Sequence, residues 1–237
     1  PMIRSSTKPE LTTDAGINRV QWDLRHEGAK RLPNAKLDAG NPDEGPMVVP
    51  GPYTLKLTVD GQSYTTTGTV LPDPRSPVTP AQLQQNVAFT LQARAALDRL
   101  RADIEDVRAI RAQARDLQER TAGNAAALAL QGTADAIVKR CDTLESHMHN
   151  PEAEVVYDVL GGRQGGAKLY SQIAPLFSDM QSSDYEPTQG QLDQMQENLA
   201  ELAQLEAQVK ALGLPRVIVP GRPALATTCA SRSAAWR

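Results

Sequence analysis

Aromatic residues are scarce in this chain, at 4% of its 237 residues. Sheet-rich proteins use aromatic and β-branched side chains heavily, so this scarcity favours an alanine- and leucine-rich helical protein over an all-β one. An apolar content of 40% and a charged content of 22% still allow a sizeable core. The length predicts one large domain or two small ones.

Cysteine, basic excess and long apolar runs are also lacking. The two cysteines, Cys141 and Cys229, provide no disulfide framework and leave the compartment open. No apolar run reaches the ~18 residues of a membrane span, and no signal peptide is evident. Because the chain begins Pro1-Met2-Ile3, we interpret it as a fragment of a longer protein.

The net charge of −3 argues against a nucleic-acid-binding protein. Residues 79–213 carry twelve basic and nineteen acidic groups, a net charge of −7, whereas residues 214–237 carry four arginines and no acid. The acidic middle of the chain is typical of solvated helical surfaces.

The longest regular pattern runs from Thr79 to about Arg120. Thr79 is suited to cap a helix, and Pro80 to its first turn, where the missing N–H costs nothing. Apolar residues recur at three- and four-residue steps, at Leu97, Leu100, Ile104, Val107, Ile110, Ala114 and Leu117. Opposite charges stand at i,i+4 in Arg101/Glu105, Arg115/Glu119 and Asp116/Arg120. The pattern predicts one long helix that needs partner helices to cover its apolar stripe.

Three further helices are predicted after the break at Gly123-Asn124. The first ends near Met148, the second follows the glycine-rich loop 161–166, and the third is capped by Thr188 and closes at Gly213. Their apolar positions are Leu130, Ala134, Ile137, Cys141, Leu144 and Met148, then Leu169, Ile173, Leu176, Phe177 and Met180, then Leu192, Met195, Leu199, Leu202, Val209 and Leu212. The run 155–160 is ambiguous between strand and helix. Long helices joined by short loops predict an antiparallel bundle.

The N-terminal third of the chain predicts β-structure. Residues 17–25 alternate, with Val20, Trp22 and Leu24 on one side, which is typical of a half-buried strand. A loop rich in Pro, Gly, Asn and Asp follows over residues 27–50.

A hairpin is predicted next. Residues 53–59 alternate, Asp60-Gly61 is a strong two-residue turn signal, and the return strand runs over 62–71. Three strands are few for an independent sheet and would leave one face and at least one edge uncovered. We therefore interpret residues 1–78 as a partial immunoglobulin-like sandwich whose first strands precede Pro1.

The segment 161–168 is the sharpest chemical candidate, because an apolar run, a glycine loop and a helix start resemble a phosphate-binding loop. A P-loop requires Gly-Lys-Ser/Thr at its end. Here Ala167 precedes Lys168, and Leu169 stands where the hydroxyl belongs, so we favour a connector between helices.

Two metal sites can be considered. Cys141, His147 and His149 contain zinc-ligand types but lack a fourth ligand, and Cys141 lies on an apolar stripe. Asp38, Asn41, Asp43 and Glu44 form an oxygen-rich loop without the EF-hand spacing, as solvated loops often do.

Trp22, Asp23 and Arg25 are a third group of candidates, for catalysis. Trp22 lies on the apolar side of its predicted strand, which favours a core role. Asp23 has no evident carboxylate partner, as a glycosidase would need, and can instead pair with Arg25 or a neighbouring strand. No Gly-x-Ser-x-Gly elbow is present. Enzymatic activity is therefore not expected from these residues.

Two strand motifs carry a family resemblance. They are Gly16-Ile-Asn-Arg-Val-Gln-Trp-Asp-Leu-Arg25 and Pro50-Gly51-Pro52-Tyr53-Thr-Leu-Lys-Leu-Thr-Val-Asp-Gly61. The chain resembles, over about residues 16–213, the C-terminal region of large bacterial sortilin/VPS10-like β-propeller proteins, exported proteins with BNR repeats that are often glycosyl-hydrolase-like. The resemblance implies an Ig-like, FlgD-like domain followed by a helical segment, which 155–160 and 165–170 also resemble. The propeller, where such a family places its ligand surface, is not part of this sequence.

The expected fold class is thus α+β, with a partial immunoglobulin-like β-sandwich over residues 1–78, an antiparallel helical bundle over 79–213 and an irregular basic tail over 214–237. No catalytic, cofactor-binding or metal residue is assigned. We expect a non-catalytic accessory region of a larger exported, periplasmic or extracellular, propeller protein, which binds its own propeller or another protein.

Two alternatives stay open. One is an accessory part of a glycoside hydrolase-like enzyme whose active site lies on the missing propeller, with Trp22 or Tyr53 contacting sugar. The other is an oligomerisation module that uses the helix over 192–212.

Overall fold

The computed structural model describes residues 13–37, 41–162, 165–212 and 234–235, and within them the fold is α+β. Two small sheets, built mainly from antiparallel pairs, accompany five α-helices. The elements are β1 (Arg25–Glu27), β2 (Glu44–Met47), β3 (Gly51–Val59), β4 (Gln62–Val70), α1 (Pro80–Thr121), η1 (Ala125–Ala127), α2 (Leu128–Met148), α3 (Val156–Leu160), α4 (Leu169–Asp179), η3 (Met180–Ser182), α5 (Gln189–Lys210) and β5 (Ala234–Ala235).

The long helix α1 is confirmed with its predicted cap. The Thr79 hydroxyl accepts from the Gln82 N–H, and the Gln82 side chain accepts from the Thr79 N–H, which together satisfy two free donors of the first turn. The predicted stripe is buried from Leu97 to Val107 and again at Ala114. Ion pairs form within the helix at Arg101–Glu105 and Arg120–Asp116.

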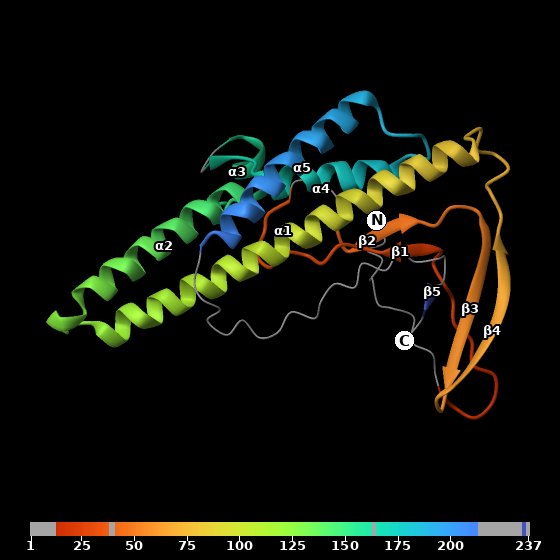
Figure 1. Ribbon diagram of the computed structural model, residues 1–237. Helices are drawn as coiled ribbons and strands as arrows, with labels where there is room; N and C mark the ends of the chain where they lie inside the picture. Colours follow the sequence, from red (N-terminus) through yellow and green to blue (C-terminus); the bar gives the residue numbers. More distant parts are fainter. Residues whose placement is uncertain (1–12, 38–40, 163–164, 213–233, 236–237) are drawn as a thin grey trace.

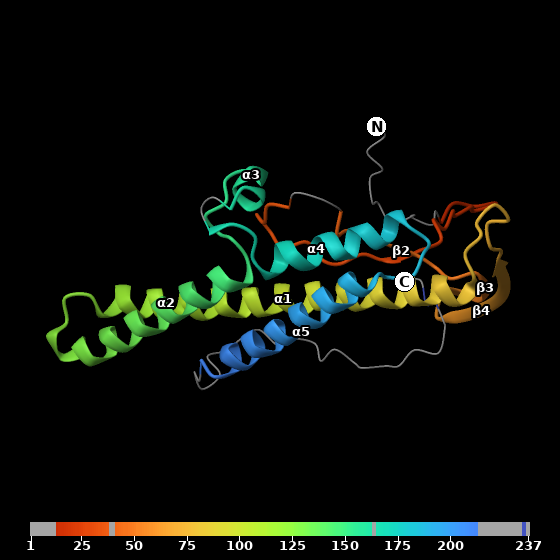
Figure 2. The same cartoon turned by 90° about the horizontal axis from the view of Figure 1, so that it is seen from above.

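Helices α2, α4 and α5 pack against α1 (Figure 1). α2 lies along the C-terminal half of α1, while α4 and α5 contact α1 and each other, and α5 crosses α1 at an angle (Figure 2). One core cluster joins residues of α1, α2, α4 and α5, including Leu100, Cys141, Phe177 and Leu202. The ambiguous run 155–160 proves to be the short helix α3.

The strand predicted over residues 17–25 is wrong for most of its length. β1 begins only at Arg25, Leu24 has a left-handed φ of 59°, and Ile17 and Val20 are exposed. β1 pairs with β2, which lies inside the segment predicted as a loop. Gly45 permits this pairing, because a Cβ there would lie 2.0 Å from the carbonyl oxygen of His26.

The hairpin is confirmed as β3 and β4, paired from Gly51↔Val70 to Val59↔Gln62. It projects from one end of α1 (Figure 1). The two-residue strand β5 runs parallel to β3 on the side away from β4.

Residues 28–37, the first part of the connection between β1 and β2, have no helix or strand and are called the docked segment below. Ala29 and Leu32 belong to the same core cluster as the helices. The backbone N–H of Leu32 donates to the Tyr170 hydroxyl at 3.2 Å, and that of Lys30 donates to Asp98 Oδ1 at 2.8 Å. The docked segment is thereby tied to α4 and α1.

Candidate interaction site

The β3–β4 hairpin owes its register to its turn. Asp60 and Gly61 have φ of 50° and 80°, which are the left-handed values of a type I′ turn. Aspartate tolerates such a φ, and glycine adopts it at no steric cost. Because this turn has the twist of the flanking strands, it fixes the Val59↔Gln62 pair and the pairs that follow from it.

Because successive side chains of a strand point to opposite sides, the hairpin has two faces. One face carries Tyr53, Leu55, Leu57 and Val59 of β3 and Tyr64 of β4, and is called the hairpin face. The same face also holds Gln62, Thr66 and Gly68 of β4, while the other face carries Thr54, Lys56, Thr58, Ser63, Thr65, Thr67 and Thr69. Such an amphipathic sheet is expected to bury its apolar side against another layer.

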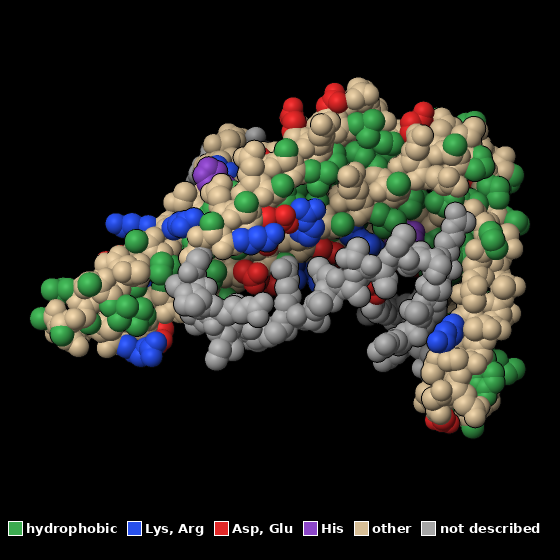
Figure 3. All heavy atoms as spheres, viewed as in Figure 1, with side chains coloured by type: hydrophobic (Ala, Val, Ile, Leu, Met, Phe, Trp, Pro, Cys, Tyr) green, Lys and Arg blue, Asp and Glu red, His purple; other side chains and the backbone are tan. Residues whose placement is uncertain are grey.

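The hairpin face is open to solvent along most of its length. The exposed fraction is 37% at Leu55, 46% at Leu57 and at Val59, and 56% at Tyr64. Apolar side chains gather towards the turn end of the hairpin, away from the helices (Figure 3). Several large apolar side chains exposed on one face are typical of a binding surface.

The base of the hairpin face is covered by an aromatic pair. Trp22 packs edge-on against Tyr53, with ring centroids 5.5 Å apart. The indole N–H donates to the carbonyl of Arg25, and the Tyr53 hydroxyl donates to the carbonyl of Val49. Trp22 and Tyr53 are each half-buried, so the pair closes the base of the hairpin face and leaves Leu55 onwards uncovered.

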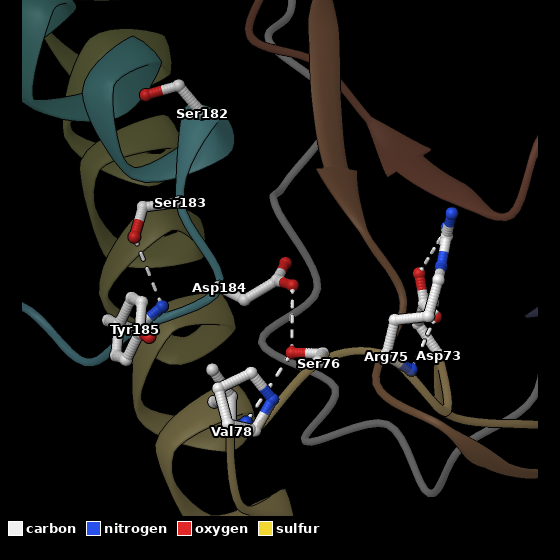
Figure 4. A pocket seen from close by; sticks show the side chains of 9 residues that line it. Asp73, Arg75, Ser76, Val78, Ser182, Ser183, Asp184 and Tyr185 are labelled. Atoms are coloured by element: carbon white, nitrogen blue, oxygen red, sulfur yellow. Dashed lines mark hydrogen bonds and ion pairs between the residues drawn. The ribbon is translucent and has the colours of Figure 1, made fainter.

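A hollow of about 500 Å³ lies between the β4–α1 connection and the segment before α5 (Figure 4). Its polar side chains pair within the hollow. Arg75 donates to Asp73 and, with this hydrogen bond as the main cause, lowers the pKa of Asp73 to about 2. Ser76 lies 3.4 Å from Asp184, and Ser183 accepts from the N–H of Tyr185. Of these contacts, Ser76–Asp184 joins the two connections, and we interpret it as fastening them together, while the other two lie within one connection each.

A buried ionic network joins α1 to α2. Glu145 is 2% exposed, and its carboxylate lies 2.7 Å from Arg108 Nε, 2.6 Å from Arg111 Nη1 and 2.9 Å from His149 Nε2. Burial opposes ionisation, but the hydrogen bonds from His149 and Arg108 and the charges of Arg108 and Arg111 outweigh it and lower the Glu145 pKa to about 2. A carboxylate held this firmly as an anion is suited to bridging helices rather than to accepting a proton near neutral pH.

The residues considered for zinc do not share a site. Cys141 is in the core, His147 is exposed, and His149 is buried beside Glu145. Burial raises the pKa of the Cys141 thiol, which disfavours the thiolate that a metal needs. Within the described ranges, no group of three or more His, Cys, Asp or Glu side chains is placed to hold a metal ion.

The oxygen-rich loop is partly described, since Asp38 lies outside the described residues. Asn41 Oδ1 accepts from the N–H of Asp43. Asp43 lies 3.7 Å from Arg31, and Glu44 lies 2.9 Å from Arg25. The two carboxylates therefore pair with separate arginines.

The remaining sequence candidates have local roles. Asp23 Oδ1 accepts from the N–H of Arg25, while the Arg25 side chain crosses to Glu44 and the carbonyl of Gly45 on β2. In the glycine-rich loop, Gly166 accepts from Asn150, and residues 163–164 lie outside the described part of the chain. The apolar residues Met195, Leu202 and Leu205 of α5 are buried inside the chain.

Comparisons with protein-family models, curated proteins and solved structures found no match. Among the helices described here, none combines the length and apolarity that a membrane crossing requires. The sequence predicted a hairpin and an uncovered sheet face, but it did not assign that face as a binding surface. The alternation in β3 could have pointed to it, because the sequence holds no obvious layer to cover that face.

Proposed function

We propose that this chain is a non-catalytic accessory region that binds, through the hairpin face, to the upstream propeller of the same exported polypeptide. The observation that carries the proposal is the solvent exposure of Leu55, Leu57, Val59 and Tyr64 on one face of a well-formed hairpin. Burying one such leucine against a partner contributes roughly 1–2 kcal/mol, since about half of its surface is already covered. The upstream propeller as occupant comes from the family resemblance of the two strand motifs.

In this proposal the hairpin belongs to a partial immunoglobulin-like sandwich, and α1, α2, α4 and α5 form an antiparallel bundle that carries it. The bundle is supported by the packing of α2, α4 and α5 on α1 and by the Arg99–Glu206 contact of 2.7 Å between α1 and α5. The sandwich is supported by the uncovered apolar side of the hairpin, which a second sheet would cover at about 10 Å.

The test is cysteine labelling of the hairpin. Leu57→Cys places a thiol on the hairpin face, and Thr58→Cys places one on the opposite face as a matched control, both in a Cys229→Ser background. In the chain alone both thiols should react rapidly with a maleimide. In the full polypeptide encoded by the gene, we expect Leu57→Cys to react at least about tenfold more slowly and Thr58→Cys to keep its rate.

Two results would contradict the proposal. One is an unchanged rate for Leu57→Cys in the full polypeptide. The other is equal slowing of both thiols, which would indicate general burial of the hairpin rather than docking on one face.

The alternative, an accessory region of a glycoside hydrolase-like enzyme, draws on the half-buried pair Trp22 and Tyr53. Sugar-binding aromatics present a flat ring face to the ligand. Here the two rings meet edge to face, and the polar atom of each is bonded to nearby backbone. The geometry therefore favours a packing role for the pair and the hairpin face as the binding surface.

A further inference from the structure

The backbone of β3 has two sides with different partners. A two-residue type I′ hairpin closes on a hydrogen-bonded pair, here Val59↔Gln62, and the pairs then alternate along the strands. The N–H and C=O groups of Leu55 and Leu57 therefore point to β4. Those of Thr54, Lys56 and Thr58 point to the opposite edge of β3.

That opposite edge already receives a strand. β5 runs parallel to β3 there, with Ala234 beside Leu55 and Ala235 beside Lys56. Its two residues cover a small part of the nine-residue strand β3. Within the described residues, no strand is paired with this edge of β3 at Thr58.

The edge of β3 also carries few of the features that prevent strand addition. Natural edges are guarded by several charged residues, prolines or bulges. β3 has Pro52 near its start and one charge, Lys56, and its pairing with β4 runs without a bulge. Pro52 thus guards the base of the hairpin, and in the outer half of β3 Lys56 is the charged residue, with no strand among the described residues paired beyond it.

A strand added here would have its side chains sorted by the sheet. Every second side chain would lie beside Leu55, Leu57 and Val59 of the hairpin face and would be favourable if apolar. The side chains between them would lie beside Thr54, Lys56 and Thr58. An acidic residue next to Lys56 would add a favourable charge pair.

We infer that the edge of β3 is a strand-acceptor site for an extended polypeptide segment that runs parallel to β3, is apolar at every second residue and carries an acid beside Lys56. The segment takes the position that β5 holds in this chain and extends along Thr58 to the turn. Main-chain hydrogen bonds supply affinity, and the hairpin face supplies specificity. This inference rests on the proposed function, because it gives the form in which a partner meets the hairpin.

The test uses a fluorescein-labelled peptide of the length of β3 that alternates valine and threonine, with one glutamate placed beside Lys56. A scrambled peptide of the same composition is the control ligand. Thr54→Pro removes a donor on the acceptor edge. Thr67→Pro is the matched control, since Thr67 is the cross-strand partner of Thr54 and its N–H faces the other edge of the sheet.

We expect the alternating peptide to bind the intact chain, and more tightly after Ala234→Pro weakens β5. Thr54→Pro should weaken binding about tenfold or more, as expected when a strand partner loses a backbone hydrogen bond and its alignment. Thr67→Pro should leave the affinity within about twofold, because its N–H is not used by the peptide.

Equal loss in both proline variants, equal binding of the scrambled peptide, or no binding to either the intact chain or Ala234→Pro would overturn the inference. The proposed function can survive that result. If Leu57→Cys is protected in the full polypeptide while Thr54→Pro leaves peptide binding unchanged, the partner docks on the hairpin face without adding a strand.

Discussion

The docked segment is irregular but contains buried residues, whereas the hairpin is regular but exposed. The docked segment has no regular secondary structure, yet Ala29 and Leu32 are 3% and 0% exposed. The hairpin has nine consecutive cross-strand pairs, yet Leu57 and Val59 are each 46% exposed. The docked segment is stabilised by burial in the core. The hairpin lacks that burial, and a ladder of hydrogen bonds alone gives a two-stranded hairpin little stability in water.

The difference lies in where each segment finds its partners. The docked segment bonds to Asp98 and Tyr170, which lie far along the chain, so it is held by the helical core. The hairpin bonds mainly to itself. The comparison indicates that a regular, local element can leave apolar side chains exposed, while the docked segment is held by contacts with distant parts of the chain.

Amide hydrogen exchange should give the largest contrast. The helix interior at 97–117 and 192–209 should open only with global unfolding, a free energy on the order of 5–10 kcal/mol. The strand residues 55–59 should exchange through local opening and be far less protected, and residues 20–24, which lack a strand, should exchange fast as well. Protection of 55–59 equal to that of α1 in the isolated chain would break the comparison and mean that the hairpin is firmly packed.

A leucine-to-alanine substitution made once in each region tests the comparison between the docked segment and the hairpin in a second way. Leu32→Ala should lower the free energy of unfolding by about 3–4 kcal/mol, because it leaves a cavity in the core. Leu57→Ala in the hairpin face should lower it by about 0.5 kcal/mol or less, because its side chain is half exposed. Urea titration of both variants measures the difference. Similar losses would show that the two segments are held alike.

Local features of this fold could be predicted from the sequence. The cap Thr79-Pro80 and the turn Asp60-Gly61 act within a few residues, so their signals are complete in the sequence itself. The apolar stripe of α1 is equally local, and its burial follows from helical periodicity.

What could not be predicted depends on distant contacts. β2 forms in a proline- and glycine-rich segment because Gly45 and Gly28 allow backbone to approach backbone closely, which no periodicity reports. The alternation over residues 17–25 predicted a strand, but Leu24 turns the chain with a positive φ and leaves Val20 exposed. The sequence predicted one uncovered sheet face, but which hairpin side chains stay exposed depends on how distant parts of the chain pack.

Glu145→Gln should lower the free energy of unfolding by less than Leu32→Ala does. Its effect concerns the contact between α1 and α2, not the hairpin. It removes the charge that holds Arg108 and Arg111 against α2. Both arginines reach solvent and Arg111 keeps Asp142, so we expect a loss of about 2 kcal/mol rather than the full cost of an orphaned buried charge. Thermal unfolding measures it, with Asp142→Asn as the control at the exposed end of the network.

The same variant should change the pH dependence. Because the folded-state pKa of Glu145 is lowered to about 2 from 4.5, its contribution is present above about pH 4.5 and is lost as the pH falls towards 2. The difference in free energy of unfolding between the unmodified chain and Glu145→Gln should therefore shrink as the pH is lowered. A gap that stays constant down to pH 2 would contradict the role of the ionised carboxylate.

A further small effect is predicted at Trp22, which packs against the base of the hairpin. A fully buried tryptophan on a core strand would cost about 3 kcal/mol or more on truncation. Trp22 is half-buried and packs edge-on against Tyr53, so we expect Trp22→Ala to lower the stability of the hairpin by about 1–2 kcal/mol. Val20→Ala is the control, since Val20 is 48% exposed and should cost almost nothing.

If residues 17–25 formed an alternating core strand, Val20 and Trp22 would share its buried side and both substitutions would be costly. Denaturant titration, with hydrogen exchange at residues 55–59 as the readout, separates the core strand from the aromatic pair. If Trp22 acts through its contact with Tyr53, Trp22→Ala destabilises the hairpin and Val20→Ala does not.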